Sequence, residues 1–161
     1  MAKKAGVSVD VYSLARVMES EERKREARIA VGWALRNWAR HKNKSITDIV
    51  TAGWTKDSNK KAIHSKSHGY YGRQNTGKYA SSISEPSKAT LQLAIDILDG
   101  KIADITNGAI KFDNVKAQSA LAKSGATGYG KTPEQVAIDR QKEGLAMVTI
   151  PGISTRFWRV A

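Results

Sequence analysis

The sequence contains no cysteine, only three histidines, and no long apolar run. Without cysteine the chain has no disulfide framework, no thiolate nucleophile and no cysteine-bound metal. His64 and His68 are four positions apart, but the stretch around them is rich in Lys, Ser and Gly and offers no acidic partner. We therefore expect no metal site and no cofactor. No stretch is long and apolar enough to span a bilayer.

The N-terminus, MAKKAGVSVDVYS, also lacks the apolar core of a secretory signal. We expect the protein to be made in the cytoplasm without a signal peptide. Any action outside the cytoplasm would then need another route of delivery or release.

Acidic residues are scarce relative to basic ones, which leaves a net charge of +12 over 161 residues. The excess is concentrated in two segments. Residues 22–44 hold eight basic and two acidic side chains, and residues 56–79 hold six and one. Such a field attracts polyanions, a class that includes nucleic acids, acidic cell-wall polymers and anionic membranes. Charge alone does not choose among them.

The apolar pattern predicts one mainly α domain (α+β) over residues 1–161, with a small β element. Helices are expected at about 9–20, 26–41, from Ser45, from Ser84-Glu85-Pro86 to 98, and at 133–143 after the capping box that begins at Thr132. On the fourth helix, Leu91, Ala94, Ile95 and Leu98 mark the expected buried face. A short strand is expected at 109–112, and a C-terminal hairpin around Pro151-Gly152. Between these elements, residues 52–82 form a long aperiodic loop with four aromatic side chains, which indicates a functional loop.

Three glutamates, Glu19, Glu21 and Glu22, lie at the seam between the first two predicted helices. A carboxylate at a helix end with apolar walls is partly shielded from water, which favours the protonated form that a general acid requires. Glu21 follows Leu14 by seven positions and Met18 by three, which predicts a place on the buried side. Helical phase by itself separates Glu21 from Glu19 only slightly, so on this pattern the three acids stay interchangeable. The alternative is a solvated acidic patch beside the basic residues that follow.

Three separated segments of the sequence together resemble a pattern found in a known protein family. The first is Leu14-Ala15-Arg16-Val17 with Ser20-Glu21, followed by Ile29-Ala30-Val31 and Asn37. The second runs from Leu98-Asp99-Gly100-Lys101 through Asp104, Thr106, Asn107, Gly108 and Ala109 to Phe112. The third is Ile153-Ser154-Thr155-Arg156-Phe157-Trp158. In this order they resemble the SleB-type cell-wall hydrolases, and the second segment is the most specific. The family's glutamate is usually followed by Ala-Arg-Gly-Glu, whereas Glu22-Arg23-Lys24-Arg25-Glu26 follows here.

The resemblance implies a lysozyme-like fold and cleavage of the β-1,4 bond between MurNAc and GlcNAc in peptidoglycan. Glu21 takes the position of the family's catalytic acid and is preferred on that ground, with Glu19 as the alternative and Glu22 expected to be an exposed neighbour. In a lytic transglycosylase one glutamate acts first as acid and then as base, while the muramic acid 6-hydroxyl attacks and leaves a 1,6-anhydro sugar. The alternative of a hydrolytic muramidase stays open, because Glu26, Asp104 or Asp113 could supply the second carboxylate that hydrolysis requires.

The loop over 52–82 resembles a glycan-binding loop of phage-type members. Sugars present apolar ring faces and hydroxyl groups, which aromatic side chains and amides bind well. The expected substrate contacts are Tyr70, Tyr71, Gln74, Asn75 and Tyr79 in this loop, and Asn107 and Phe112 in the second segment. The alternative is that these tyrosines simply pack onto the domain. Trp33 and Trp38 are expected in the core.

Two alternatives to a cell-wall hydrolase belong to other functional classes of protein. Taken alone, the basic charge with interspersed aromatic residues would favour a nucleic-acid-binding protein. The second alternative is a structural protein of a virus particle that has the same fold and binds the cell wall but has no catalytic activity. The expected partners are peptidoglycan strands and other proteins of a virion or injection machine. The expected location is accordingly the virion, or the cell wall after release.

Overall fold

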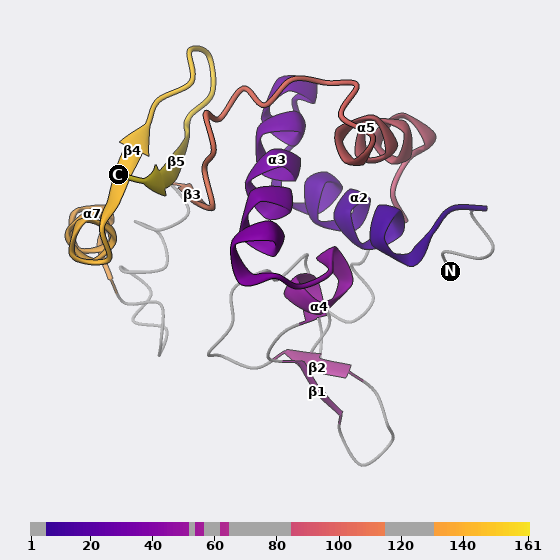
Figure 1. Cartoon of the computed structure of the whole chain (residues 1–161), viewed down its shortest axis with the longest axis horizontal. Helices are drawn as coiled ribbons and strands as arrows, with labels where there is room; N and C mark the ends of the chain where they lie inside the picture. The colour runs from indigo at the N-terminus through magenta and orange to yellow at the C-terminus, as the bar shows by residue number, and fades with distance from the viewer. Residues whose placement is uncertain (1–5, 52–53, 57–61, 65–84, 115–130) are drawn as a thin grey trace.

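The computed structural model describes residues 6–51, 54–56, 62–64, 85–114 and 131–161. Four helices pack together and a small antiparallel sheet lies beside them (Figure 1). The helices are α2 (Val9–Glu21), α3 (Arg25–Lys42), α4 (Ile46–Thr51) and α5 (Lys88–Leu98). The sheet has the order β3-β5-β4, with strands β3 (Lys111–Asn114), β4 (Leu145–Val148) and β5 (Thr155–Val160), and helix α7 (Pro133–Lys142) packs against β4. The predicted combination of helices with a small β element is confirmed.

Local hydrogen bonds explain where the helices begin and end. Ser8 and Ser45 accept bonds from backbone N–H groups three residues on, at 3.2 and 3.0 Å. The predicted capping box of α7 is present, with Thr132 and Gln135 bonded reciprocally. Helix α3 ends at Asn43, whose left-handed backbone (φ 54°) suits asparagine. The start at Ser45 and the capping box at Thr132 are predicted from the sequence, because each depends on residues within one turn of chain.

Helix α5 departs from expectation at its start and in its buried face. It begins after Ser87, which accepts a bond from the Thr90 N–H, and not after Ser84. Its buried residues are Thr90, Leu93, Ala94 and Ile97, so of the expected face only Ala94 is fully buried. Leu91, Ile95 and Leu98 pack against the core while half-buried. Lys88, Gln92 and Asp96 form one polar stripe, but apolar residues cover the remaining, broader part of the helix, so periodicity alone does not choose the buried face.

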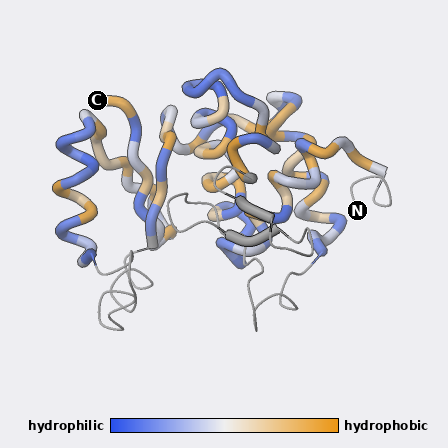
Figure 2. Tube along the Cα trace, turned by 90° about the horizontal axis from the view of Figure 1, so that it is seen from below, coloured by the Kyte–Doolittle hydropathy of each residue, from blue (hydrophilic) through white to orange (hydrophobic). Residues whose placement is uncertain are grey.

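The main core lies among α2, α3, α4 and α5, and helix α3 runs through its middle. Gly32 allows close packing there, since a Cβ atom would lie 2.7 Å from Ile97 Cδ1 and 2.9 Å from Met18 Sδ. Trp33 is buried as expected, and Trp38 packs, half-buried, against both this core and a smaller cluster of Ile110, Leu145 and Trp158. Hydrophobic segments gather toward the middle of the molecule, and α7 is largely hydrophilic (Figure 2).

The strand expected at 109–112 begins two residues later, at Lys111, and it joins the predicted C-terminal hairpin in one sheet. Strand β5 lies in the centre, with Phe112 opposite Phe157 on one side and Met147 opposite Trp158 on the other. The Ile110 N–H extends the pairing by donating to the Trp158 carbonyl at 2.8 Å. Phe157 is fully buried in the main core, so the sheet is anchored on the helices.

The segment predicted as a loop over 52–82 contains regular structure in its described part. Strands β1 (Trp54–Lys56) and β2 (Ala62–His64) pair antiparallel, with Trp54 opposite His64. Such three-residue strands are too short for a period-two pattern to be read from the sequence. The predicted contacts Tyr70, Tyr71, Gln74, Asn75 and Tyr79 lie outside the described residues.

Candidate functional site

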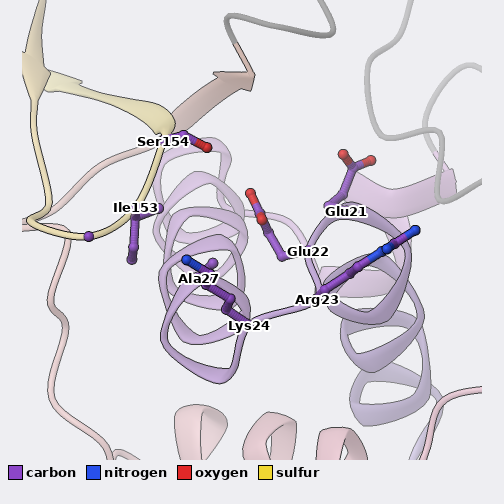
Figure 3. Close-up of a pocket in the computed structure, with 8 residues that line it drawn as sticks. Glu21, Glu22, Arg23, Lys24, Ala27, Ile153 and Ser154 are labelled. Atoms are coloured by element: carbon purple, nitrogen blue, oxygen red, sulfur yellow. The ribbon is translucent and has the colours of Figure 1, made fainter.

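A pocket of about 230 Å³ opens where the α2–α3 junction faces the turn of the β4–β5 hairpin (Figure 3). One wall comes from the helix junction and the other from the hairpin, more than a hundred residues away in sequence. The lining residues are Glu21, Glu22, Arg23, Lys24, Ala27, Gly152, Ile153 and Ser154. Two carboxylates, two cations and a hydroxyl therefore share one concave surface.

Glu21 is the last residue of α2 and is exposed, so its predicted place on the buried side is wrong. The helix ends at this residue, and the next residue, Glu22, already has an extended backbone (φ −140°, ψ 152°). Helical phase places a side chain against the core only where neighbouring elements cover it, and that cover reaches Met18 in the last turn but not Glu21. The carboxylate of Glu21 stands at the pocket, turned to the same side as that of Glu22 (Figure 3).

Glu22 is half-buried and tied to the hairpin, which corrects the expectation that it is exposed. The hydroxyl of Thr155, a residue only 3% exposed, donates a hydrogen bond to its carboxylate. Arg28 Nε donates to the Glu22 carbonyl oxygen at 2.7 Å. These bonds hold the chain between α2 and α3 in one conformation, and they join this junction to the sheet. Thr155 is 133 residues from Glu22, a separation at which sequence patterns do not predict pairing.

Glu19 is built into a polar network between helices. Its carboxylate pairs with the Arg28 guanidinium and accepts bonds from the Ser87 N–H at 2.8 Å and the Thr90 hydroxyl at 3.3 Å. Burial acts to raise the pKa of Glu19, but the bonds from Ser87, the charge of Arg28 and the bond from Thr90 together bring the pKa below its usual value. Glu19 is thus held as an anion away from the pocket and is a poor candidate for a general acid.

The most specific segment of the family resemblance forms a turn between α5 and β3, and side-chain hydrogen bonds from Asn37 attach this turn to α3. Asp104 accepts bonds from the Thr106 N–H and hydroxyl at 2.8 and 2.6 Å, from the Gly108 N–H at 3.0 Å and from Asn37 Nδ2 at 2.9 Å. Asn37 Nδ2 also donates to the Ala109 carbonyl at 3.0 Å. The segment therefore has a structural role in this chain: it fixes where the sheet begins relative to α3.

Asn107 and Phe112, the two predicted contacts within the described residues, do not line the pocket. Asn107 is exposed at the tip of the turn with a left-handed backbone (φ 54°). Phe112 packs half-buried against the core, with its ring centroid 6.1 Å from that of Phe157. The structure therefore does not bring Asn107, Phe112 and Glu21 together around the described pocket.

The other candidate carboxylates also have partners. Asp113, 9% exposed at its side chain, accepts bonds from Arg156 Nε at 2.9 Å and Trp158 Nε1 at 2.6 Å. Glu26 is exposed and pairs with Arg25 at 2.7 Å. Neither lines the pocket. With Asp104 held in its turn, no predicted second carboxylate faces Glu21 from the hairpin wall of this pocket.

In the described parts of the chain, no three His, Cys, Asp or Glu side chains are grouped as a metal site would require. None of the described helices combines the length and apolar character needed to cross a membrane. Comparison of the whole chain with family models, curated proteins and solved structures gave no match.

Proposed function

We propose that this protein is a peptidoglycan-degrading glycosidase with a lysozyme-like fold, and that Glu21 is its general acid. One observation carries the proposal: Glu21, at the end of a helix, lines a pocket whose opposite wall is a β-hairpin. A glycan strand lying between a helix end and a sheet would meet this carboxylate at one face of a sugar bond. The resemblance of three segments to SleB-type hydrolases supports the same residue.

The proposed reaction is that of a lytic transglycosylase. Hydrolysis normally needs a second carboxylate on the far side of the scissile bond. The hairpin wall offers only Gly152, Ile153 and Ser154, and Glu22 lies next to Glu21 on the same wall. A mechanism in which the muramic acid 6-hydroxyl is the nucleophile needs only one carboxylate. Glu21 would protonate the leaving oxygen and then accept the proton of the attacking hydroxyl.

Glu22 would act in this site as a positioning residue. Its bond from Thr155 and the Arg28 bond to its carbonyl hold the backbone that carries Glu21. A general acid contributes only when its carboxyl group stays within hydrogen-bonding reach of the leaving oxygen. The tether between helix junction and hairpin therefore serves the proposed chemistry as well as the fold.

The test is Glu21→Gln, which keeps size and polarity but removes the proton donor. On purified peptidoglycan the parent should release soluble muropeptides ending in 1,6-anhydro-MurNAc, detected by mass spectrometry. The variant should be slower by at least about a hundredfold, the usual size of a general acid contribution. Glu134→Gln, an exposed change in the first turn of α7, is the matched control and should leave the rate unchanged.

Other products would contradict particular parts of the proposal. Reducing MurNAc ends would show hydrolysis in place of transglycosylation. Full activity of Glu21→Gln would remove Glu21 as the acid. If the parent binds insoluble peptidoglycan and releases nothing, the protein is a wall-binding component without catalytic activity.

A further inference from the structure

The end of α3 that leads into α4 carries basic side chains that have no role in the proposed chemistry. Between Glu26 and Asp48 the sequence has no acidic residue. The basic end of α3 consists of Arg40, His41, Lys42 and, just after the helix, Lys44, which are all exposed. Helix α3 has 18 residues and is therefore about 27 Å long. In Figure 1 its basic end lies beside α4, and the turn of the β4–β5 hairpin, which lines the Glu21 pocket, lies beside its other end.

The cations of the basic end have no ion-pair partner among the described residues. Arg40, Lys42 and Lys44 take part in none of the ion pairs found there. A helix C-terminus attracts cations, but it carries only about half a negative charge, so three positive side chains leave the surface positive. The charge acts on a neighbour: the pKa of Arg36, lowered mainly by burial, is lowered further by the charge of Arg40.

Two aromatic rings lie among these charges. The centroid of the Trp38 ring is 4.7 Å from Lys42 Nζ and 5.4 Å from Lys111 Nζ. The imidazole of His41 stacks on Trp38, with ring centroids 5.6 Å apart and an angle of 19° between the planes. Trp38 packs against both apolar clusters, so it gives the exposed His41 a fixed support. The basic end therefore presents a flat ring beside positive charges.

The positions of the three cations suit a polymer and not one small anion. Arg40 and Lys42 are two residues apart on α3, so their side chains leave the helix on nearly opposite sides. A helix with its side chains is about 10–12 Å across, a width that one small anion does not bridge. Successive phosphates of a strand that crosses the helix end can each contact one cation. Lys44 adds a third charge in the exposed segment that follows.

We propose that the basic end of α3 binds single-stranded nucleic acid, with phosphates at its three cations and a base stacked on His41. Proteins that bind single strands without sequence preference combine a positive surface with aromatic side chains on which bases stack. A polyanion without bases would use the charges and leave the ring unused. In a duplex the bases are enclosed in the stack and do not reach such a ring. This binding goes beyond the proposed glycosidase function and does not depend on Glu21.

The experiment measures fluorescence anisotropy of three labelled probes at low salt and over a salt series. The probes are an oligothymidylate, an abasic strand of the same length and a duplex of the same length. We expect the oligothymidylate to bind most tightly, and about fivefold or more tightly than the abasic strand, which is the least that stacking of one base contributes.

The combined variant Arg40→Gln, Lys42→Gln and Lys44→Gln tests the phosphate contacts. It should bind the oligothymidylate about tenfold more weakly at low salt, because three phosphate contacts are lost. Each contact to a single strand contributes about 0.7 to the slope of log affinity against log salt, so the slope should become shallower by about 2. The changed side chains are exposed, so the variant should keep the melting temperature of the parent.

The matched control is the combined variant Lys24→Gln, Arg25→Gln and Lys88→Gln. It removes the same charge from exposed positions at the starts of α3 and α5. Its affinity for the oligothymidylate should stay within about twofold of the parent, and its salt slope should not change. If the control loses as much affinity as the test variant, net charge and not the basic end causes binding, and the inference is overturned.

His41→Ala tests the stacked base. It should weaken binding of the oligothymidylate about fivefold and leave binding of the abasic strand unchanged. His41→Phe keeps a flat ring and should retain the difference between the two strands. No loss with His41→Ala, or an equal loss for both strands, would show that no base stacks on this ring and would overturn the inference.

Tighter binding of the duplex than of the single strand, or binding of no oligonucleotide at all, would also overturn it. Glu21→Gln should bind the oligothymidylate as the parent does. Nucleic-acid binding and activity on peptidoglycan can therefore be confirmed or contradicted separately.

Discussion

Three glutamates within four positions at the end of α2 have different chemical surroundings. Glu19 is an anion enclosed by Arg28 and the start of α5. Glu22 accepts the Thr155 hydroxyl, and Glu21 stands exposed at the pocket. All three lie in the same short stretch of sequence. Side chains from distant parts of the chain give Glu19 and Glu22 structural roles, and its place at the pocket makes Glu21 the candidate acid.

Glu19→Gln should destabilise the fold by about 2 kcal/mol at neutral pH, because it leaves the Arg28 guanidinium without its anion. The pKa of Glu19 is lowered in the folded state, so its stabilisation is complete above the ordinary value of 4.5 and is lost as the pH falls through the folded value. The free energy of unfolding of parent and variant, measured by urea denaturation, should therefore converge in acid.

Glu26→Gln is the matched control for this prediction, since Glu26 is exposed and paired with the adjacent Arg25. It should leave the free energy of unfolding nearly unchanged at every pH. A difference between parent and Glu19→Gln that stays constant below pH 4.5 would show that Glu19 is not the linked group.

At the scale of elements, signals contained within one turn of chain are predicted well and those that depend on packing are not. The helix start at Ser45 and the capping box at Thr132 form as predicted. The buried face of α5 differs from the prediction, because apolar residues cover a broad part of that helix and contacts with α2 and α3 decide which of them are buried.

Gly32→Ala should destabilise the fold by about 1 kcal/mol even though alanine favours helices, because the added methyl group meets Ile97 Cδ1 and Met18 Sδ between three packed helices. Ile97→Val removes the closer of these atoms. In the Ile97→Val background, Gly32→Ala should lower the free energy of unfolding by less, or raise it. Thermal or urea unfolding of the parent, the two single variants and the double variant measures this difference as a favourable coupling energy. Additive effects would show that the contact with Ile97 does not limit the packing.

The whole molecule joins its helices and sheet through shared side chains. Phe157 of β5 lies in the helical core, Trp38 packs against both apolar clusters, and Asn37 bonds to the turn before β3. We therefore expect one cooperative unfolding transition, as the single domain predicted over residues 1–161 requires. Thermal melts followed by far-ultraviolet circular dichroism and by tryptophan fluorescence should coincide, and two separated transitions would contradict this.

Helix positions, caps, turns and the basic charge follow from residues close together in the sequence, because each depends on contacts within a turn or two of chain. So does the presence of Glu21 at the end of α2. Folding brings the hairpin residues Gly152, Ile153 and Ser154 opposite Glu21 and places Thr155 on Glu22. It also encloses Glu19 and Asp113 with basic partners. These pairings join distant residues through packing and charge, and they distinguish Glu21, which lines the pocket, from carboxylates with structural roles such as Glu19 and Asp113.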